Sequence, residues 1–419
     1  MQLKRRSIES RVLRALDIFP AVYVNGPRQA GKTTLVRVLL SKQFKGKYVT
    51  FDDPLEKSAA MRNPQLYLSD CGYPVIIDEI QMVPEIFRPL KMQIDEQRYE
   101  CLTSGQEQPN GRYLLTGSAN LWATPKLADA MVGRMGITTI LPFSACEYWG
   151  GKGDFITRAF AADFTDVGKS KHNLLDAMHV ATYPEIVEMK SDSIANWFQQ
   201  YIQKVTLQDP QQIYNLEKAE YMPLLVESLA ARTGNLINDA DIARDIGLTS
   251  VTTRTYRNLL EGTFITNTIR PWYRNTNKRL VKAGKSYFHD TLLLAHLLKA
   301  TPEELLKKQP QRFGHLLENF VLSELTKLNN NSDNKVQILF YRTRDHKEVD
   351  FVLESPRGKI VGIEVKHAEN VKQRDLAGLK ELREVAGKDF ACGIVLCNTK
   401  RVLPFGENIY LVPFNFLWS

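Results

Sequence analysis

One short run, G-P-R-Q-A-G-K-T at residues 26–33, constrains the fold of this chain more than any other feature. It has the spacing of a phosphate-binding loop, whose glycines allow a tight turn so that backbone N–H groups face the β-phosphate. An apolar run at 21–24 precedes it, and an amphipathic stretch at 34–40 follows it. This order predicts a strand, a loop and a helix. We therefore expect an α/β nucleotide-binding domain with ATP as its ligand.

The positions of the loop have distinct predicted roles. Lys32 brings a positive charge to the β- and γ-phosphates, which makes it catalytic as well as binding, and the Thr33 hydroxyl ligates Mg²⁺. Arg28 is a candidate for contact with phosphate or with a partner. The residues expected to contact the nucleotide are Gly26, Pro27, Arg28, Gln29, Ala30, Gly31, Lys32, Thr33 and Thr34.

A second apolar run, at 74–77, ends in the carboxylates Asp78 and Glu79. In a phosphate-loop enzyme, such a strand delivers an acid to the metal beside the loop. We expect Asp78 to hold Mg²⁺, largely through water, and Glu79 to polarise the water that attacks the γ-phosphate.

Two later segments provide further candidates for the same site. A predicted strand at 111–120 ends in small polar residues, and strand ends of a parallel sheet face the ligand. Thr116, Ser118 or Asn120 can therefore sense the γ-phosphate, unless this is an ordinary polar strand end. Arg134, in a glycine-containing bend, can stabilise transition-state charge in its own subunit or a neighbour's, or be structural. Action on a neighbour would require a homo-oligomer.

Composition argues against several classes of protein. The apolar runs fall short of the ~20 residues that span a bilayer, and no apolar segment of a secretory signal follows the charged N-terminus. Five cysteines without a Cys-x-x-Cys pair argue against a disulfide framework and a zinc knuckle. We therefore expect a cytoplasmic protein without membrane contact. The net charge of +8 permits nucleic-acid binding without establishing it.

The middle of the chain predicts helices. Residues 152–211 have a helical, rather aromatic pattern that suits a lid or connector. A capped helix in the run 238–249, ended by a glycine, a helix at 250–260 and a hairpin outline a winged helix-turn-helix, which either reads DNA or serves in packing. A basic, aromatic stretch at 270–279 suits a phosphate backbone or a solvated hairpin edge. The candidate groove-reading residues are Thr252, Thr253, Arg254, Tyr256, Arg257 and Asn258.

The pattern of the C-terminal part predicts a helix near 315–325, strands at 336–342, 349–353 and 360–365, a helix at 375–385 and a strand at 392–397. This order resembles the PD-(D/E)XK nuclease fold, an α/β restriction-endonuclease-like domain. Asp350 and Glu364 would converge on Mg²⁺ or Mn²⁺ with Glu318 from the first helix. Lys366, on the same strand face as Glu364, would activate water. The alternatives are an ordinary wet strand face, or a domain that binds without cutting.

Several motifs together resemble a prokaryotic family of AAA-superfamily ATPases: G-P-R-Q-A-G-K-T-T-L, I-I-D-E-I-Q, L-L-T-G-S and V-G-R. That family joins an ATPase core to a nuclease-like C-terminal domain, formerly a domain of unknown function. L-P-F-S at 141–144 resembles its exit segment, although Ala181 and Thr182 stand where its later turn has glycines. We expect an ATPase core at 1–150, a helical lid and winged helix at 151–275, and a nuclease-like domain at 276–419.

Two functions remain as alternatives. In the first, ATP hydrolysis controls a nuclease-like domain that acts on nucleic acid, DNA rather than RNA. In the second, the chain is a nucleotide-dependent switch whose C-terminal domain binds a partner and cuts nothing. A kinase built on the same loop is disfavoured by the Asp78-Glu79 pair.

Overall fold

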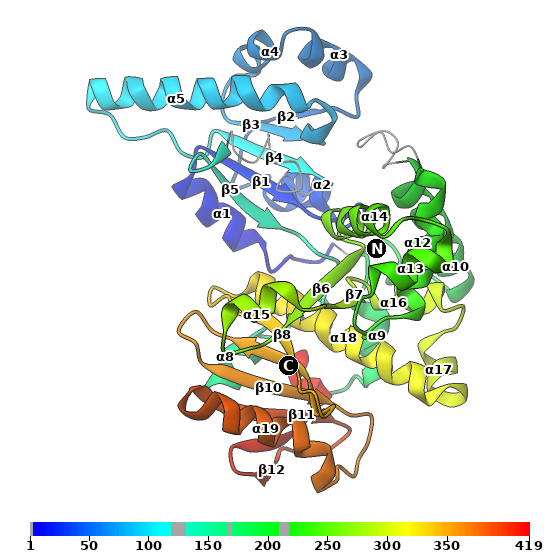
Figure 1. Cartoon of the computed structure of the whole chain (residues 1–419). Coiled ribbons are helices and arrows are strands. Elements are labelled where there is room, and N and C mark those ends of the chain that lie inside the picture. Colours follow the sequence, from blue (N-terminus) through cyan, green and yellow to red (C-terminus); the bar gives the residue numbers. More distant parts are fainter. Residues whose placement is uncertain (1–2, 119–130, 166–169, 209–217) are drawn as a thin grey trace. The chain divides into compact units, whose positions relative to one another are not determined.

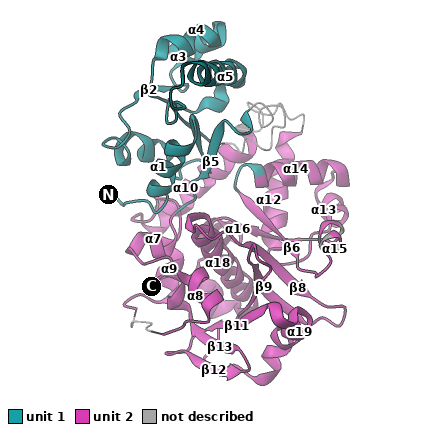
Figure 2. Ribbon diagram, turned by 90° about the vertical axis from the view of Figure 1, so that its left-hand side faces the viewer, with its two compact units in different colours: residues 1–142, 262–264 teal, residues 143–261, 265–419 magenta. Residues whose placement is uncertain are grey.

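The structure is a computed structural model that describes residues 3–118, 131–165, 170–208 and 218–419. It has two compact units (Figure 2), one of residues 1–142 and 262–264 and one of residues 143–261 and 265–419. The chain thus passes between units a few residues before the predicted boundary at 150. The predicted boundary at 275 lies inside the second unit. Over the described ranges, no helix is long and apolar enough to cross a membrane.

The first unit is an α/β fold built on a parallel sheet, as predicted. Within the described residues the sheet has five strands in the order β2-β3-β4-β1-β5, and all four pairings are parallel. Figure 1 shows these elements in blue to cyan. They are β1 Ala21–Asn25, β2 Lys47–Thr50, β3 Val75–Asp78, β4 Tyr113–Gly117, β5 Met135–Thr139, α1 Glu9–Ile18, α2 Lys32–Thr34, α3 Pro54–Arg62, α4 Pro64–Cys71 and α5 Phe87–Ser104.

The central strands are buried on both faces, which explains their nearly continuous apolar sequence. Tyr23 and Ile77 pack in one cluster with Leu90 of α5, whereas Val22 and Ile76 pack in another with residues of α1. Strands are present at all three positions where the sequence predicts them. The predicted helix at 34–40 is present as α2 and a π-helical turn, Leu35–Leu39.

The second unit carries a mixed sheet, eight-stranded in the described part of the chain, of order β12-β13-β11-β10-β9-β8-β6-β7. Its strands are β6 Thr266–Pro271, β7 Lys285–Phe288, β8 Gln337–Arg342, β9 Glu348–Glu354, β10 Ile360–Val365, β11 Phe390–Cys397, β12 Leu403–Gly406 and β13 Ile409–Pro413. Its helices are α7 Ala145–Trp149, α8 Phe155–Ala161, α9 Leu174–Val180, α10 Ser191–Gln203, α12 Met222–Ala231, α13 Asp239–Ile246, α14 Ser250–Gly262, α15 Thr276–Val281, α16 Thr291–Leu297, α17 Pro302–Lys308, α18 Pro310–Asn331 and α19 Ala377–Ala386.

The predicted C-terminal order of helix, three strands, helix and strand is present as α18, β8 to β10, α19 and β11. Residues alternate between two apolar clusters along the strands. Val361 and Ile363 of β10 share a cluster with Phe320 of α18, whereas Ile360 shares one with Leu379 of α19. This alternation follows from the two-residue period of a strand.

The two helices and the strand pair expected of a winged helix are present, but the strand pair is part of a larger sheet. α13 ends at Gly247, which has a left-handed backbone, and α14 begins at Ser250. β6 and β7 pair in antiparallel orientation, but α15 separates them along the chain and β6 also pairs in parallel with β8. The strand pair therefore belongs to the large sheet, and DNA binding by this region stays a prediction.

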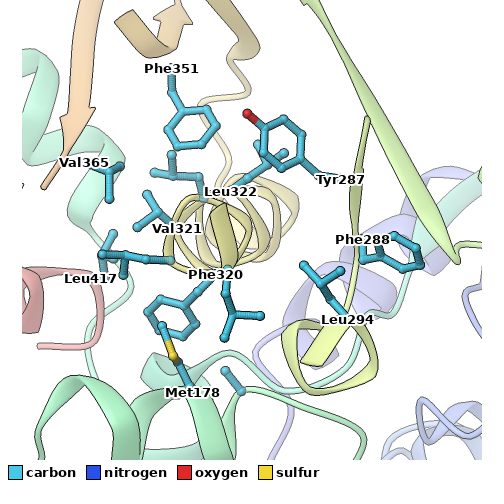
Figure 3. Packing of buried hydrophobic residues seen from close by; sticks show 14 of the residues in the cluster. Met178, Tyr287, Phe288, Leu294, Phe320, Val321, Leu322, Phe351, Val365 and Leu417 are labelled. Atoms are coloured by element: carbon cyan, nitrogen blue, oxygen red, sulfur yellow. The ribbon is translucent and has the colours of Figure 1, made fainter. Parts of the chain in front are cut away.

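Helix α18 lies at the centre of the second unit. Figure 3 shows its Phe320, Val321 and Leu322 surrounded by buried side chains that include Phe351 and Leu417. In its C-terminal half the polar residues Ser323, Glu324 and Lys327 are buried as well. Glu324 and Lys327 form an ion pair of 3.4 Å there. Because a buried charge is costly without partners, this pair needs the hydrogen bonds that surround it.

Half-buried His289, which lies within reach of the Lys327 charge, makes the stability of the second unit depend on pH. Burial, with a smaller contribution from the charge of Lys327, lowers the pKa of His289 to about 4. Between pH 6.5 and 4, this histidine is therefore protonated in the unfolded chain but not in the folded chain. The free energy of unfolding falls as the pH falls through this range, by up to about 3 kcal/mol. His289→Asn should lose less unfolding free energy than wild type between pH 7 and 4.5, measured by urea unfolding. Exposed His346→Asn is the control; equal slopes in all three proteins would contradict the assignment.

Candidate functional site

The predicted phosphate-binding loop lies between β1 and α2, at the carboxyl end of the sheet. Gly26 and Gly31 have φ of 150° and 92°, and Gln29 has φ of 61°. A Cβ atom at Gly26 would lie 2.0 Å from the carbonyl oxygen of Ile140. Glycine is therefore required at Gly26 both by its backbone angle and by the close approach of another segment.

Two cations hold the carbonyl groups of the loop. Buried Lys32 donates from Nζ to the carbonyl oxygens of Gly26 (3.1 Å) and Pro27 (2.8 Å). Arg6, before α1, donates from Nη1 to the carbonyl oxygen of Ala30 (2.7 Å). The Lys32 ammonium thus lies over the loop where phosphate oxygens would be received. Arg28 is half-buried, and Gln29 and Thr34 are exposed.

Asp78, at the end of β3, accepts three hydrogen bonds. Its Oδ2 accepts from Thr33 Oγ1 (2.8 Å) and from the Tyr48 hydroxyl (2.7 Å), and its Oδ1 accepts from Thr116 Oγ1. Burial and the hydrogen bond to Asp78 raise the pKa of Tyr48 to about 12. The hydroxyl of Thr33 and the carboxylate of Asp78 are hard oxygen donors of the kind that Mg²⁺ prefers, so these residues fit the metal.

Glu79 and Ser118 are brought together by a residue to which the sequence assigned no role. Gln81 donates from Nε2 to the Glu79 carboxylate and to Ser118 Oγ (3.0 Å). The Glu79 backbone has φ of 54°, and its N–H donates to Thr116 Oγ1 (3.3 Å). Glu79 is thus oriented beside Asp78. Asn120, the other predicted sensor, lies outside the described residues.

No role was predicted for Tyr48, Gln81 or Arg6. Gln81 follows Glu79 by two residues inside the quoted I-I-D-E-I-Q run, which is a usable signal. Tyr48 lies on β2, the strand next to β3, so only the sheet order identifies it. Arg6 is far from the loop in sequence and is identified by contact alone.

Arg134 lies at the other end of the sheet from the loop. It precedes β5, whose Met135 pairs with Ala21 at the start of β1, whereas the loop follows Asn25 at the end of β1. A five-residue strand spans about 16 Å. Arg134 forms an ion pair with Asp95 of α5, with Nη2 at 2.9 Å from Oδ2. The structure therefore does not bring Arg134 to the loop of its own chain.

The predicted C-terminal site residues lie in one charged cluster. Asp350 Oδ2 accepts from the Val365 N–H (2.8 Å), and Lys366 Nζ lies 2.9 Å from Glu364 Oε1. The second Glu364 oxygen, Oε2, is buried without a hydrogen bond among the described residues. β7 adds buried Lys285, which forms an ion pair with Glu348. The sequence had not placed Lys285 in this cluster.

Burial changes the acidity of the whole C-terminal cluster. Burial and the charge of Asp350 raise the pKa of Glu318 to about 8, and burial also raises the pKa values of Asp350 and Glu364. The charge of Glu364 raises the pKa of Lys366 despite burial. No group of three or more His, Cys, Asp or Glu side chains in the described part of the chain is arranged to hold a metal ion. The carboxylates expected to bind a metal therefore influence one another's charge, but they are not arranged as a complete set of metal ligands.

Most candidate nucleic-acid contacts are used inside the protein. On α14, Thr253 and Tyr256 are buried, and Arg254 and Arg257 both pair with Asp239 at 3.0 and 3.1 Å. The stretch at 270–279 is similar, because its Trp272 and Arg279 are buried and both hydrogen-bond to Glu354. Of the predicted groove-reading set, Arg254 and Asn258 are the exposed residues.

The close approach at Gly26 predicts a specific effect of a methyl group. Gly26→Ala should abolish nucleotide binding, because the added carbon would overlap the carbonyl group of Ile140 and displace the loop. Binding of a fluorescent ATP analogue measures this. Gly105→Ala is the matched control, because Gly105 also has positive φ but nothing lies within 4 Å of its Cβ position. Its cost should be about 1–2 kcal/mol of stability with binding retained. Normal binding by Gly26→Ala would refute the assignment.

Comparison with known proteins gives three family matches along the chain. Residues 19–149 match the model of an AAA domain. Residues 171–304 match a domain of unknown function, DUF8612, and residues 313–417 match another, DUF4143. Two mycobacterial relatives are the uncharacterized proteins Rv2008c of Mycobacterium tuberculosis and Mb2031c of Mycobacterium bovis. Each is 27% identical over 366 residues, covering 87% of this chain and 74% of the relative.

Among solved structures, the chain is similar to the Walker-type ATPase PABY2304 of Pyrococcus abyssi and to the ORC2 protein of Aeropyrum pernix. The first has 13% identity, a TM-score of 0.39 and coverage of 71% of this chain and 96% of that one. The second has 12% identity, a TM-score of 0.30 and coverage of 71% and 94%. Both TM-scores are too low to support an argument. From the family match and the loop, residues 19–149 form an AAA-type ATP-binding domain.

Proposed function

We propose that this chain is a Mg²⁺-dependent ATPase whose nucleotide cycle controls a C-terminal nuclease-like domain that binds or cleaves nucleic acid. One observation carries the ATPase part: the hydrogen bond of 2.8 Å between Thr33 Oγ1 and Asp78 Oδ2. It joins the hydroxyl of the loop to the acid of the second strand, and these are the two groups that a phosphate-loop enzyme places around its metal.

The residues around the loop have separate tasks in this proposal. Thr33 and Asp78 would hold Mg²⁺, which would supply positive charge beside the phosphate groups. Lys32 exchanges its bonds to the loop carbonyl groups for bonds to phosphate, which stabilises the charge that develops in the transition state. Glu79, held by Gln81, orients the attacking water, and Ser118 lies close enough to respond to the γ-phosphate through the same glutamine.

The C-terminal part of the proposal rests on the element order and on the charged cluster. Asp350 and Glu364 would hold Mg²⁺ or Mn²⁺ together with Glu318, and the buried, unpartnered Oε2 of Glu364 is an available ligand atom. Lys366 would hold the water or the phosphate oxygen. DNA is the favoured nucleic acid, through the exposed part of α14. Arg134 could act only on the nucleotide of a neighbouring subunit, in a homo-oligomer, after leaving Asp95.

The ion pairs of the same cluster favour a second candidate function. Lys366 with Glu364 and Lys285 with Glu348 already compensate two carboxylates without a metal. Such a cluster suits a domain that binds a partner and cuts nothing, which would make the chain a nucleotide-dependent switch. Metal-dependent cleavage separates the two candidates.

The ATPase part of the proposal predicts the effects of two substitutions at the loop and at the end of β3. Lys32→Ala should lose tight ATP binding, because the ammonium that lies over the loop carbonyl groups would be removed. Glu79→Gln should keep ATP bound and slow hydrolysis at least about 100-fold, because the water loses its base. Phosphate release and analogue binding measure both. Glu85→Gln, on an exposed glutamate nearby, is the control for Glu79. Normal turnover by Glu79→Gln would remove that residue from catalysis.

The nuclease part of the proposal predicts the effects of substitutions in the C-terminal charged cluster. If the domain is a nuclease, cleavage of labelled DNA or RNA in Mg²⁺ or Mn²⁺ should be lost in Asp350→Ala and in Lys366→Ala, while ATP hydrolysis persists. Exposed Glu369→Ala and Lys372→Ala are matched controls that should cleave normally. Gel analysis of the nucleic acid from the ATPase reactions measures both activities together. Hydrolysis of ATP by wild type with intact nucleic acid would favour the switch.

A further inference from the structure

The chain leaves the first unit beside the phosphate-binding loop. The Ile140 N–H donates to the carbonyl oxygen of Asn25 (2.8 Å), and the Ile140 carbonyl group lies against Gly26, where no side chain fits. Arg6 then connects the two segments, since its Nη1 donates to Ala30 O (2.7 Å) and its Nη2 donates to Leu141 O (2.6 Å). One buried guanidinium therefore holds both the loop and the exit of the chain.

Immediately afterwards the chain is held again, inside the second unit, by helix α18. Lys327 Nζ donates to the carbonyl oxygens of Phe143 (2.9 Å) and Ala181 (3.0 Å). The Glu324 carboxylate accepts from the Ala145 N–H (2.9 Å), and the Phe143 N–H donates to Thr182 O (3.0 Å). Glu324 and Lys327 are at most 3% exposed. Charged groups buried this deeply fix the position of the backbone groups that they hold.

Only Pro142 separates the last residue held in the first unit, Leu141, from the first residue held in the second, Phe143. Proline fixes φ and offers no N–H at this position. On the far side, α18 is one continuous helix whose residues Asn319 to Leu325 are all buried. It carries Glu318 about 13 Å along its axis from Lys327, at a rise of about 1.5 Å per residue.

We infer that residues 140–145 are a coupling segment that carries the nucleotide state of the loop to α18 and thus to the C-terminal site. The inference rests on the proposed function and adds to it the route of regulation. Phosphate that draws Lys32 away from the carbonyl groups of Gly26 and Pro27 shifts the loop backbone. Ile140 and Arg6 follow, because both are in contact with the loop, and Leu141 passes the shift through Pro142 to Phe143.

The route has the features that conformational coupling requires. It consists of buried hydrogen bonds and a rigid helix, and close-packed elements of this kind respond by changing arrangement rather than by deforming gradually. Arg6 and Lys327 are positioning residues in this scheme, since neither contacts nucleotide or nucleic acid. Each holds carbonyl groups from two different segments, which distinguishes them from ordinary surface cations.

Hydrogen exchange of the full-length protein, followed by mass spectrometry with and without Mg²⁺ and a non-hydrolysable ATP analogue, tests the inference. In wild type, the analogue should protect residues 26–34 and change the exchange of α18 amides at 316–328 by at least about fivefold, the lower end of usual allosteric couplings. Insertion of two glycines between Pro142 and Phe143 leaves the hydrogen bonds of Arg6, Glu324 and Lys327 in place but makes the connection longer and more flexible. It should keep the loop protection and lose the α18 response.

Substitutions provide an independent arm with matched controls. Arg6→Gln should weaken the loop protection and the α18 response together, because Arg6 holds both the loop and Leu141. Arg5→Gln, on a neighbour whose side chain is 88% exposed, should behave as wild type. The same two glycines inserted after Gly358, in an exposed turn, control for the insertion. An α18 response that persists with the longer connection and in Arg6→Gln overturns the inference, as does a wild-type α18 that ignores a protected loop. An unprotected loop in wild type instead overturns ATP binding itself, and the coupling with it.

Discussion

Parallel pairing of strands buried on both faces is the constraint on which the nucleotide site depends. Because such strands accept polar residues only where they end, the loop after β1, Asp78 after β3 and the polar residues of β4 all meet at one edge. β4 lies between β1 and β3, and this places Thr116 within hydrogen-bonding reach of Asp78. The site is therefore a product of sheet order as much as of motif.

Local patterns were sufficient to predict the loop, the central strands and the order of the C-terminal elements. Each depends on neighbours in sequence: glycines at fixed spacing, apolar runs, and alternation. The prediction failed to identify Tyr48, Gln81 and Arg6, because their roles arise from contacts between distant segments. Arg134 shows a related limit. Its position in a glycine-containing bend allowed a phosphate contact in its own subunit or a neighbour's, and the local pattern could not tell that it lies at the end of the sheet opposite the loop.

Several basic residues of the second unit pair with acidic residues inside it, and this limits what composition can say. The net charge of +8 permitted nucleic-acid binding without establishing it. Yet Arg257 pairs with Asp239 and Glu261, and Arg279 pairs with Glu354. A count of basic residues cannot separate those that meet a partner from those that hold strands and helices together, because the difference lies in their tertiary neighbours.

The pairing of β6 with β7 and β8 also decides how the chain can be divided. A fragment that began at residue 276 would keep β7 and β8 but lose β6, the strand between them. Two rows of backbone N–H and C=O groups would then be unpaired, and exposed strand edges of this kind promote aggregation. The smallest fragment that preserves the large sheet and the segment bound by α18 starts at Phe143. The helical middle and the C-terminal elements therefore have to be kept together in any fragment.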